Sequence, residues 1–365
     1  MAIYISGNKK IKNIFANVNG ERKSISSVWV NKDNIPTKVF QLKNEESPDL
    51  YETAPADAYN NWNYTLNDEV NTITLNYYIG SETDVIVYGN YVINEKSYKT
   101  QIASNTTNNI ASKYMFSGMS NIITIKFSKK IDTSNVTDMN CMFKGCAALT
   151  QLDLSNFNTS NVINMFLMFY GCSKLTQLNL SNFNTSNVTD MNAMFNGCAA
   201  LTQLDLSNFN TSNVTNMRDM FCGCSKLTQL CLDSFNTINV TDMFRMFGDC
   251  HKLTSLDISG FDTKQVTNIS NMFYNCKMLT NLNISNFNTS NVIGMANMFG
   301  GCTNLTILDL SNFETSNVTN MYGMFYYSSN LTKVLVSRNK WIIKLNCNRT
   351  NMFTGCGCNA VTYID

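Results

Sequence analysis

A unit of about 26 residues is repeated along most of this chain, from Met142 to Tyr327. One copy reads MFNGCAALTQLDLSNFNTSNVTNMRD, and its Met-Phe pair recurs at Met142, Met168, Met194, Met220, Met246, Met272, Met298 and Met324. A fixed period in this range, with apolar residues locked to one phase, is typical of a solenoid, in which each unit buries its apolar face only against its neighbours. The repeat therefore predicts a stack of coils and not a single globular core.

Within each unit the pattern predicts a strand, a turn and a short helix. The run Leu201–Leu206 reads L-x-x-L-x-L, which as a strand turns Leu204 and Leu206 to the core. The Asn- and Ser-rich run that follows is typical of a turn, with its phenylalanine anchored inside. Apolar residues at helical spacing over Met217–Cys224 predict one or two helical turns. Together these elements predict a leucine-rich-repeat-like solenoid with a continuous parallel sheet along one side.

The sequence on both sides of the repeats differs in composition and divides into further segments. Residues 1–41 predict a small β module, because alternating apolar residues flank Asn19-Gly20, a hairpin signal. Residues 42–56 hold two of the three prolines and are expected to form a linker. Residues 57–114 are rich in strand formers and are expected to cap the first coil. The solenoid is expected over 115–327 and a C-terminal cap over 328–365.

Charge and hydropathy exclude several classes of protein. Lys and Arg number 27, Asp and Glu number 26, and the net charge is +1, so the chain has no basic footprint for nucleic acid. The sequence has no apolar run long enough to cross a bilayer, which argues against membrane insertion. Its N-terminus has the wrong order and length for a signal peptide.

A cysteine recurs at one position of each unit. Thirteen cysteines would suit a disulfide scaffold, but side chains that stack in parallel about 4.8 Å apart are poorly placed for disulfides. Zinc is less expected still, because the chain has no repeated C-x-x-C and one histidine. We expect a buried, reduced structural ladder made of Cys146, Cys172, Cys198, Cys224, Cys250, Cys276 and Cys302.

One outward strand position alternates between carboxylates and other side chains. It reads Asp153, Asn179, Asp205, Cys231, Asp257, Asn283 and Asp309. Carboxylates in adjacent coils would repel by about 1 kcal/mol even in water, and the alternation keeps them apart. A calcium ladder is the alternative, although calcium needs several converging oxygens.

No catalytic set can be assembled from this sequence. His251 stands alone, and the repeated cysteines have no histidine or constant cationic neighbour that would activate them. The chain has no phosphate loop or dinucleotide fingerprint. We therefore expect a non-enzymatic protein that uses neither a cofactor nor a metal.

The positions that flank the Met-Phe pair vary from unit to unit, whereas the scaffold positions are constant. Variation confined to one surface of a rigid array is how repeat proteins carry a binding face, and exposed aromatic and arginine side chains are the usual anchors. The alternative is that an exterior position tolerates any residue. The candidate binding residues are Phe166, Tyr170, Arg218, Phe244, Arg245, Tyr274, Tyr322 and Tyr326.

The repeat LTQLDLSNFNTSNVTDMxxMFxGC resembles the BspA-like leucine-rich repeats, which are also found in mycoplasma surface lipoproteins. The lead-in TDVIVYGNYVINEKSYKTQIAS resembles the cap that often precedes them. The resemblance covers about residues 84–354. It implies a bacterial surface or adhesion role, with host or neighbouring cells as partners, although we find no signal peptide, lipobox or wall-anchoring tail.

The opening segment NVNGERKSISSVWVNKDNIPTKVF resembles short repeats at the start of gut-bacteriophage tail and fibre proteins. The two resemblances together predict a tail- or fibre-associated virion protein, assembled in the host cytoplasm. Residues 1–41 would dock to other virion proteins, and the solenoid would recognise a bacterial surface glycan or protein. The alternatives are a BspA-like adhesin at the bacterial cell surface and a purely structural virion scaffold subunit. Homo-oligomerisation is left open.

Overall fold

The structure, a computed structural model, describes residues 15–18, 21–24, 27–32, 35–41, 51–104 and 114–365. The chain forms two units, Met1–Leu50 and Tyr51–Asp365, which we describe separately. In the first unit, β1 (Phe15–Val18) pairs antiparallel with β2 (Glu21–Ser24), and β3 (Ser27–Lys32) pairs antiparallel with β4 (Ile35–Gln41). The expected turn at Asn19-Gly20 lies outside the described residues.

The second unit begins with a mixed four-stranded sheet in the order β5-β6-β9-β8, preceded by the short 3-10 helix η1 (Ala58–Asn61). Its strands are β5 (Trp62–Asn67), β6 (Thr72–Tyr78), β8 (Asn90–Ile93) and β9 (Lys96–Ile102). Strand β7 (Asp84–Val87) leaves this sheet and pairs in parallel with β10 (Thr124–Phe127), which belongs to the solenoid. Backbone hydrogen bonds therefore join this sheet region to the first coil.

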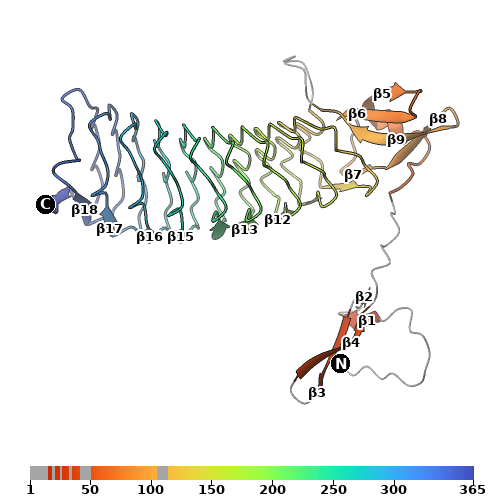
Figure 1. Cartoon of the computed structure of the whole chain (residues 1–365), viewed down its shortest axis with the longest axis horizontal. Helices are drawn as coiled ribbons and strands as arrows, with labels where there is room; N and C mark the ends of the chain where they lie inside the picture. The colour runs from red at the N-terminus through yellow and green to blue at the C-terminus, as the bar shows by residue number, and fades with distance from the viewer. Residues whose placement is uncertain (1–14, 19–20, 25–26, 33–34, 42–50, 105–113) are drawn as a thin grey trace. The chain divides into compact units, whose positions relative to one another are not determined.

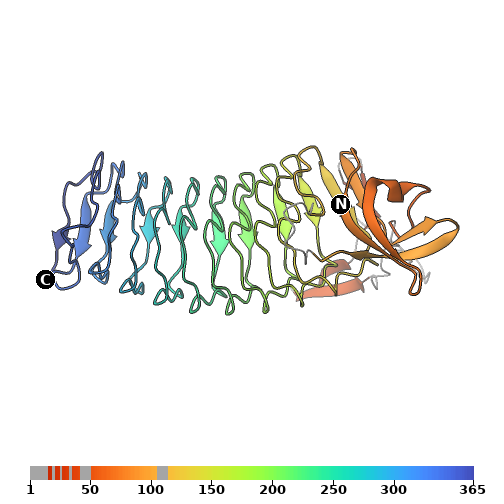
Figure 2. The same ribbon diagram turned by 90° about the horizontal axis from the view of Figure 1, so that it is seen from above.

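The repeats form a solenoid with one short parallel strand per coil, as the sequence predicts (Figures 1 and 2). Equivalent residues of successive coils lie opposite each other: Gln203 pairs with Gln229, and Leu204 pairs with Leu230. After β10 the strands are β11 (Gln151–Asp153), β12 (Gln177–Asn179), β13 (Gln203–Asp205), β14 (Gln229–Cys231), β15 (Ser255–Leu256), β16 (Asn281–Leu282), β17 (Ile307–Asp309), β18 (Lys333–Val336) and β19 (Thr362–Tyr363).

The predicted short helix is wrong, because Met217–Cys224 forms a series of turns. Two residues of this segment have left-handed backbone angles, Asp219 with φ 56° and Gly223 with φ 72°. A right-handed helix cannot continue through such residues. Their neighbours bond across coils instead, as Phe221 N–H donates to the carbonyl of Met246 at 2.9 Å. Each segment thus holds its neighbours through its backbone.

The sheet along the solenoid is not continuous, which corrects a second expectation. Among the described strands, hydrogen-bonded pairing is absent between β12 and β13, between β14 and β15, and between β16 and β17. We call these three places the seams. Strands of two or three residues contribute few bonds, and other parts of the coils hold the stack together. At the first seam, Phe169 N–H still donates to the carbonyl of Met194 at 2.9 Å.

Stacked apolar side chains fill the solenoid. The rings of Phe143 and Phe169 lie parallel with centroids 5.6 Å apart, and the stack continues through Phe195, Phe221 and Phe247 at 5.6–5.7 Å. Each ring is fully buried. Burying a side chain of this size stabilises a fold by about 1.5–3 kcal/mol, so the repeated apolar positions dominate stability.

Side-chain ladders satisfy the polar backbone of the turns. The buried hydroxyl of Thr185 donates to the carbonyl of Asn210 at 3.0 Å and accepts from its N–H at 2.9 Å. The Asn187 amide donates to the carbonyl of Ser160 at 2.8 Å. On the opposite side of the turns, successive coils are joined by isolated bridges, such as the one between Asp190 and Asn216.

Candidate functional site

All eight candidate binding residues lie beside the Met-Phe pairs, on a surface that we call the turn edge. They occupy three positions of the coil: two residues before the methionine, one residue before it, or one residue after the phenylalanine. Tyr170 and Tyr322 are exposed, whereas Phe166, Arg218, Phe244, Arg245, Tyr274 and Tyr326 are partly buried. Arg245 has a left-handed backbone, and each of the other seven immediately precedes a residue that has one.

The structure brings Arg218 and Phe244 together. The guanidinium carbon lies 3.9 Å from the ring centroid, a cation–π contact between adjacent coils. Arg218 also lies 3.3 Å from a carboxylate oxygen of Asp219 and 3.6 Å from one of Asp242. Burial raises the pKa of Asp219, and the positive charges of Arg218 and Arg245 only partly oppose this effect. This part of the turn edge is therefore densely charged.

Arg245 forms an ion pair with Asp249 on the same turn edge. Its Nη2 lies 2.7 Å from Asp249 Oδ2, and the Asn275 amide donates to Asp249 Oδ1 at 2.9 Å. Burial opposes ionisation of Asp249, but these hydrogen bonds outweigh it and lower the pKa of the carboxyl. His251 Nε2 lies 3.5 Å from the same carboxylate. The isolated histidine thus belongs to a surface charge network.

Tyr274, Tyr322 and Tyr326 form one aromatic cluster with Tyr327. The rings of Tyr326 and Tyr327 meet edge to face with centroids 4.4 Å apart. The pKa of Tyr326 is raised by desolvation first, and then by the hydroxyl groups of Tyr327, Tyr322 and Tyr274. The intervening coil carries Gly300, where a Cβ would come within 3.2 Å of the Tyr274 ring. The Tyr274 ring therefore lies against the backbone of Gly300, where a larger residue would crowd it.

Sequence reasoning missed Tyr327. It occupies the position where most coils carry glycine, and it keeps the left-handed backbone with φ 53°. Its side chain is 55% exposed, more than Tyr170 or Tyr322. The signal in the sequence is the replacement of a repeated glycine by a bulky residue, a costly exchange at positive φ.

Phe166 and Tyr170 stand apart from the other candidates. The coil that follows them carries Asn192 and Asn196 at the equivalent positions. Their one charged neighbour among the described contacts is Lys144, whose Nζ lies 5.9 Å from the Tyr170 ring centroid. The eight candidates thus form three separate groups along the turn edge.

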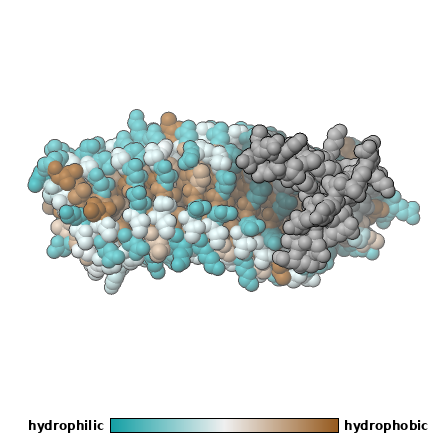
Figure 3. Space-filling model, turned by 90° about the horizontal axis from the view of Figure 1, so that it is seen from below, coloured by the Kyte–Doolittle hydropathy of each residue, from teal (hydrophilic) through white to brown (hydrophobic). Residues whose placement is uncertain are grey.

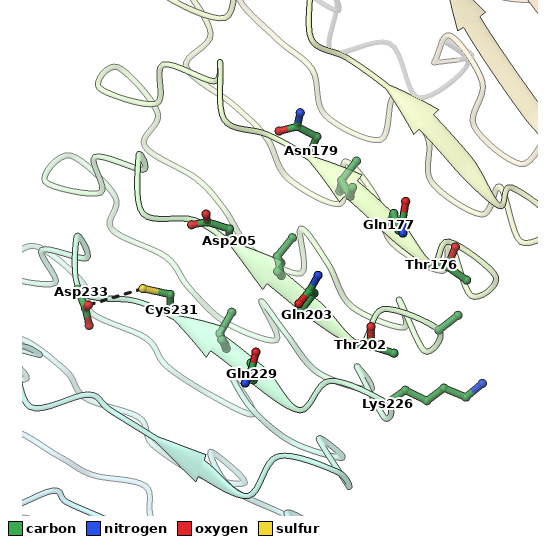
Figure 4. A pocket seen from close by; sticks show the side chains of 14 residues that line it. Thr176, Gln177, Asn179, Thr202, Gln203, Asp205, Lys226, Gln229, Cys231 and Asp233 are labelled. Carbon is green, nitrogen blue, oxygen red and sulfur yellow. Dashed lines mark hydrogen bonds between the residues drawn. The ribbon is translucent and has the colours of Figure 1, made fainter. Parts of the chain in front are cut away.

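A second candidate site lies on the sheet side of the coils, where a shallow hollow of about 910 Å³ opens at the seam between β12 and β13 (Figure 4). One glutamine from each of three successive strands, Gln177, Gln203 and Gln229, forms a row along the hollow. A second row is made by Asn179, Asp205 and Cys231. The alternating Asp position thus lines this hollow, a placement that the sequence did not indicate.

The Asp side chains of this row also stabilise turns. Asp205 Oδ1 accepts from Ser207 N–H at 2.9 Å, and Asn179 Oδ1 accepts from Ser181 N–H at 3.1 Å. The hydrogen bond from Ser207 lowers the pKa of Asp205, so the carboxylate stays charged. No group of three or more His, Cys, Asp or Glu residues in the described ranges could hold a metal ion.

A further hollow of about 570 Å³ continues the first, since Gln177 and Asn179 line both. It reaches β10 and ends near Tyr51, whose ring centroid lies 6.0 Å from Lys126 Nζ. We call the two hollows together the sheet groove. It runs over five successive strands, β10 to β14.

The repeated thiols lie inside the stack, away from both surfaces. All seven cysteines of the ladder are unbonded to one another and fully buried. Each Sγ donates to a phenylalanine carbonyl, as Cys198 does to Phe169 at 3.2 Å. Burial raises the pKa of Cys146 to about 12 and that of Cys224 to about 12. Such thiols are protonated and shielded, which makes them poor nucleophiles.

Comparisons with known proteins give the following similarities. A leucine rich cell surface protein from Faecalibacterium prausnitzii A2-165 is 17% identical with a TM-score of 0.37, over 84% of this chain and 93% of that one. A T. pallidum leucine rich repeat protein is 16% identical with a TM-score of 0.31, over 70% and 91%. A leucine-rich repeat protein from Bacteroides ovatus ATCC 8483 is 14% identical with a TM-score of 0.31, over 84% and 98%. No curated protein matches this chain.

In the part of the chain that the structure describes, no helix is both long and apolar enough to span a bilayer. One protein family matches most of the sequence. It is described as "Mycoplasma protein of unknown function, DUF285", and its matches cover residues 90–203, 175–257, 199–285 and 252–362. These ranges extend from strand β8 to the last coil, and the chain belongs to this family.

Proposed function

We propose that this chain is a non-enzymatic recognition protein that binds a partner at a bacterial surface through its turn edge, in the manner of an adhesin. The tyrosine cluster carries this proposal. It places Tyr274, Tyr322, Tyr326 and Tyr327 together on a rigid stack, and two of them are 39% and 55% exposed. Exposed aromatic side chains on a preorganised surface are the usual anchors of protein interfaces.

The charged group at Arg218, Phe244 and Arg245 supports the same role. Arginine held over an aromatic ring loses little freedom on binding, because its position is already fixed. The resemblance to BspA-like repeats agrees with an adhesin, whose partner would be a surface protein or glycan. Catalysis has no support in the contacts of the turn edge, where the ionisable groups pair with one another.

The virion role is the second candidate. It rests on the resemblance of residues 1–41, which lie outside the matched ranges of the family. Gene neighbourhood separates the two roles, since tail or capsid genes next to this one would favour the virion and genes for surface attachment the adhesin. The adhesin is preferred because it draws on the repeats themselves.

Flow cytometry of the labelled full chain on bacterial and host cells tests the proposal. We expect binding that the double variant Tyr322→Ala/Tyr326→Ala weakens by about tenfold or more. The matched control is Ile238→Ala, which removes an apolar side chain that is 51% exposed on another turn of the coil. Equal binding by the tyrosine variant and the control would contradict a role for the cluster.

A further inference from the structure

In the middle of the solenoid, from β13 to β16, the strands join two by two, whereas β10, β11 and β12 pair without a break and β17, β18 and β19 form one sheet. Strands β13 and β14 pair with each other, as do β15 and β16, whereas the seams separate these pairs. Within a pair, Thr228 N–H donates to the carbonyl of Thr202 at 2.9 Å, and the Thr228 hydroxyl donates to the same carbonyl at 3.0 Å. The pairs are therefore units of structure and not only of sequence.

The side chains of the sheet groove follow the same period. The strand leucine is buried in the first strand of each pair, as Leu204 is, and only half-buried in the second, as Leu230 is. The outward row alternates in phase, with Asp205 on the first strand and Cys231 on the second. Lys226 stands before the second strand, where the first has Ala200. A ligand that fits this groove would present the same chemical groups at every second coil.

The groove is amphipathic across its width. Half-buried Leu178 and Leu230 contribute apolar surface to its lining, whereas Leu204, which is only 3% exposed, turns to the core. Polar side chains flank them in two rows, one of glutamines and one of Asn, Asp and Cys. On the coils that are left uncovered, Figure 3 shows a band of apolar residues along the stack with hydrophilic residues on both sides. A pyranose ring has the complementary form, because its C–H face is apolar and its hydroxyl rim forms hydrogen bonds.

Charge narrows the class of ligand. The first hollow contains Asp205 and Asp233 on one side and Lys226 on the other, so charges of both signs line it. Neither a polyanion nor a polycation would find a uniform complement there. The other residues of the lining are uncharged, and they include four side-chain amides and two threonine hydroxyls. This lining favours an uncharged chain rich in hydroxyl groups.

We infer that the sheet groove binds a linear, uncharged β-1,4-linked glycan that runs along the solenoid. Successive sugars of such a chain are flipped, so the same face returns every second sugar. Neighbouring strands lie about 4.8 Å apart, close to the length of one pyranose, so five strands would seat about five sugars. Tyr51 lines the groove at its β10 end, beside Lys126.

An extended peptide is the competing occupant. It would need a continuous row of unpaired backbone N–H and C=O groups, as in the addition of a strand to a sheet edge. The strands of the groove instead pair with each other, apart from the seam between β12 and β13. From β11 to β14 the groove presents one glutamine amide per strand, and at β10 it presents the side chains of Thr124 and Lys126.

The test is isothermal titration of the full chain with cellohexaose and with the hexamer of N-acetylglucosamine. We expect at least one of them to bind, with an affinity that rises from the dimer to about the hexamer and does not rise further. The double variant Gln203→Ala/Gln229→Ala should weaken binding by about tenfold, since each lost hydrogen bond contributes about 0.5–1.5 kcal/mol, or roughly two- to tenfold. Both side chains are exposed, so their loss should leave the fold unchanged.

The matched control is Gln265→Ala, an exposed glutamine on a turn outside the groove. It should bind like the parent chain, and so should Tyr322→Ala/Tyr326→Ala. The inference is overturned if neither hexamer binds, or if the glutamine variant binds as tightly as the parent. Loss of glycan binding in the tyrosine variant alone would place the glycan at the turn edge, which overturns this inference and leaves the proposed function intact.

Discussion

Arg218 holds its guanidinium over the ring of Phe244, with 3.9 Å between Cζ and the ring centroid, although the two residues belong to different coils. We expect this contact to contribute about 0.5–1 kcal/mol to stability. A double-mutant cycle with Arg218→Ala and Phe244→Ala, followed by urea unfolding, measures it. The control cycle pairs Arg218→Ala with Phe166→Ala, which lies two coils away and should give additive effects. Additivity in both cycles would show that the contact contributes nothing.

The thiol ladder should tolerate serine and not valine. Cys198→Ser keeps a donor for the carbonyl of Phe169, and serine already fills this position at Ser328, whose Oγ donates to the Phe299 carbonyl at 2.6 Å. Cys198→Val leaves a buried carbonyl without its partner, at a cost of about 1–3 kcal/mol. Thermal unfolding of both variants should rank serine above valine. The reverse order would mean that the thiol acts only by filling space.

The thirteen cysteines should differ in reactivity by their burial. Cys231 is exposed and should react within minutes with a thiol reagent under native conditions. Cys356 and Cys358 are half-buried, with their sulfurs 3.5 Å apart, and should follow more slowly. The seven ladder thiols should react only after unfolding. Rapid labelling of Cys198 in the folded protein would contradict the burial of the ladder thiols.

Asp219 should destabilise the folded chain at neutral pH, where it is ionised, more than at acidic pH, where it is protonated. Burial raises its pKa in the folded chain above the unfolded value of about 3.9, so ionisation opposes folding at neutral pH and not at acidic pH. Asp219→Asn removes this cost, and Asn271 already occupies the same position with φ 58°. We expect the variant to unfold at a higher temperature than the parent at pH 7. The difference should shrink as the pH falls towards 3.5, and a difference that does not change with pH would exclude this origin.

Because Gly197 has a left-handed backbone, its replacement by different residues should destabilise the fold by different amounts. Its φ is 74°, and a Cβ would lie 3.4 Å from the Cα of Gly171. Gly197→Ala should therefore cost about 1–2 kcal/mol. Gly197→Asn should cost less, because asparagine tolerates this region and Asn275 adopts φ 58° at the same position. Melting temperatures of the two variants compare them directly, and equal losses would assign the cost to crowding alone.

The sequence predicted the solenoid because its period and its apolar phase are both visible. Leu204, Phe209 and Cys198 point inward for the reason that their spacing suggested. The helix was wrong because residues such as Asp219 give no sign in their identity of a left-handed backbone. Gly223 is a residue type that favours a left-handed backbone, but a glycine after an apolar segment is also typical of the C-terminal end of a helix.

Much of the candidate site could not be read from the sequence. The variable positions indicated the turn edge, but the contact of Arg218 with Phe244 depends on the register of adjacent coils. The sheet groove was missed because Gln203 looked like any outward strand residue. The seams depend on backbone pairing, and the alternation of Asp205 with Asn179 was interpreted as avoidance of repulsion alone.

From β13 to β16, where strands join two by two, a coil is equivalent to the second coil along and not to its immediate neighbour. Ala147-Ala148 recurs as Ala199-Ala200, and Ser173-Lys174 recurs as Ser225-Lys226. Within the coils that carry these pairs, inserting or deleting an even number of coils keeps the alternation, whereas an odd number brings two coils of one kind together. The length of this protein is thus free to change during evolution in double steps, without redesign of either end.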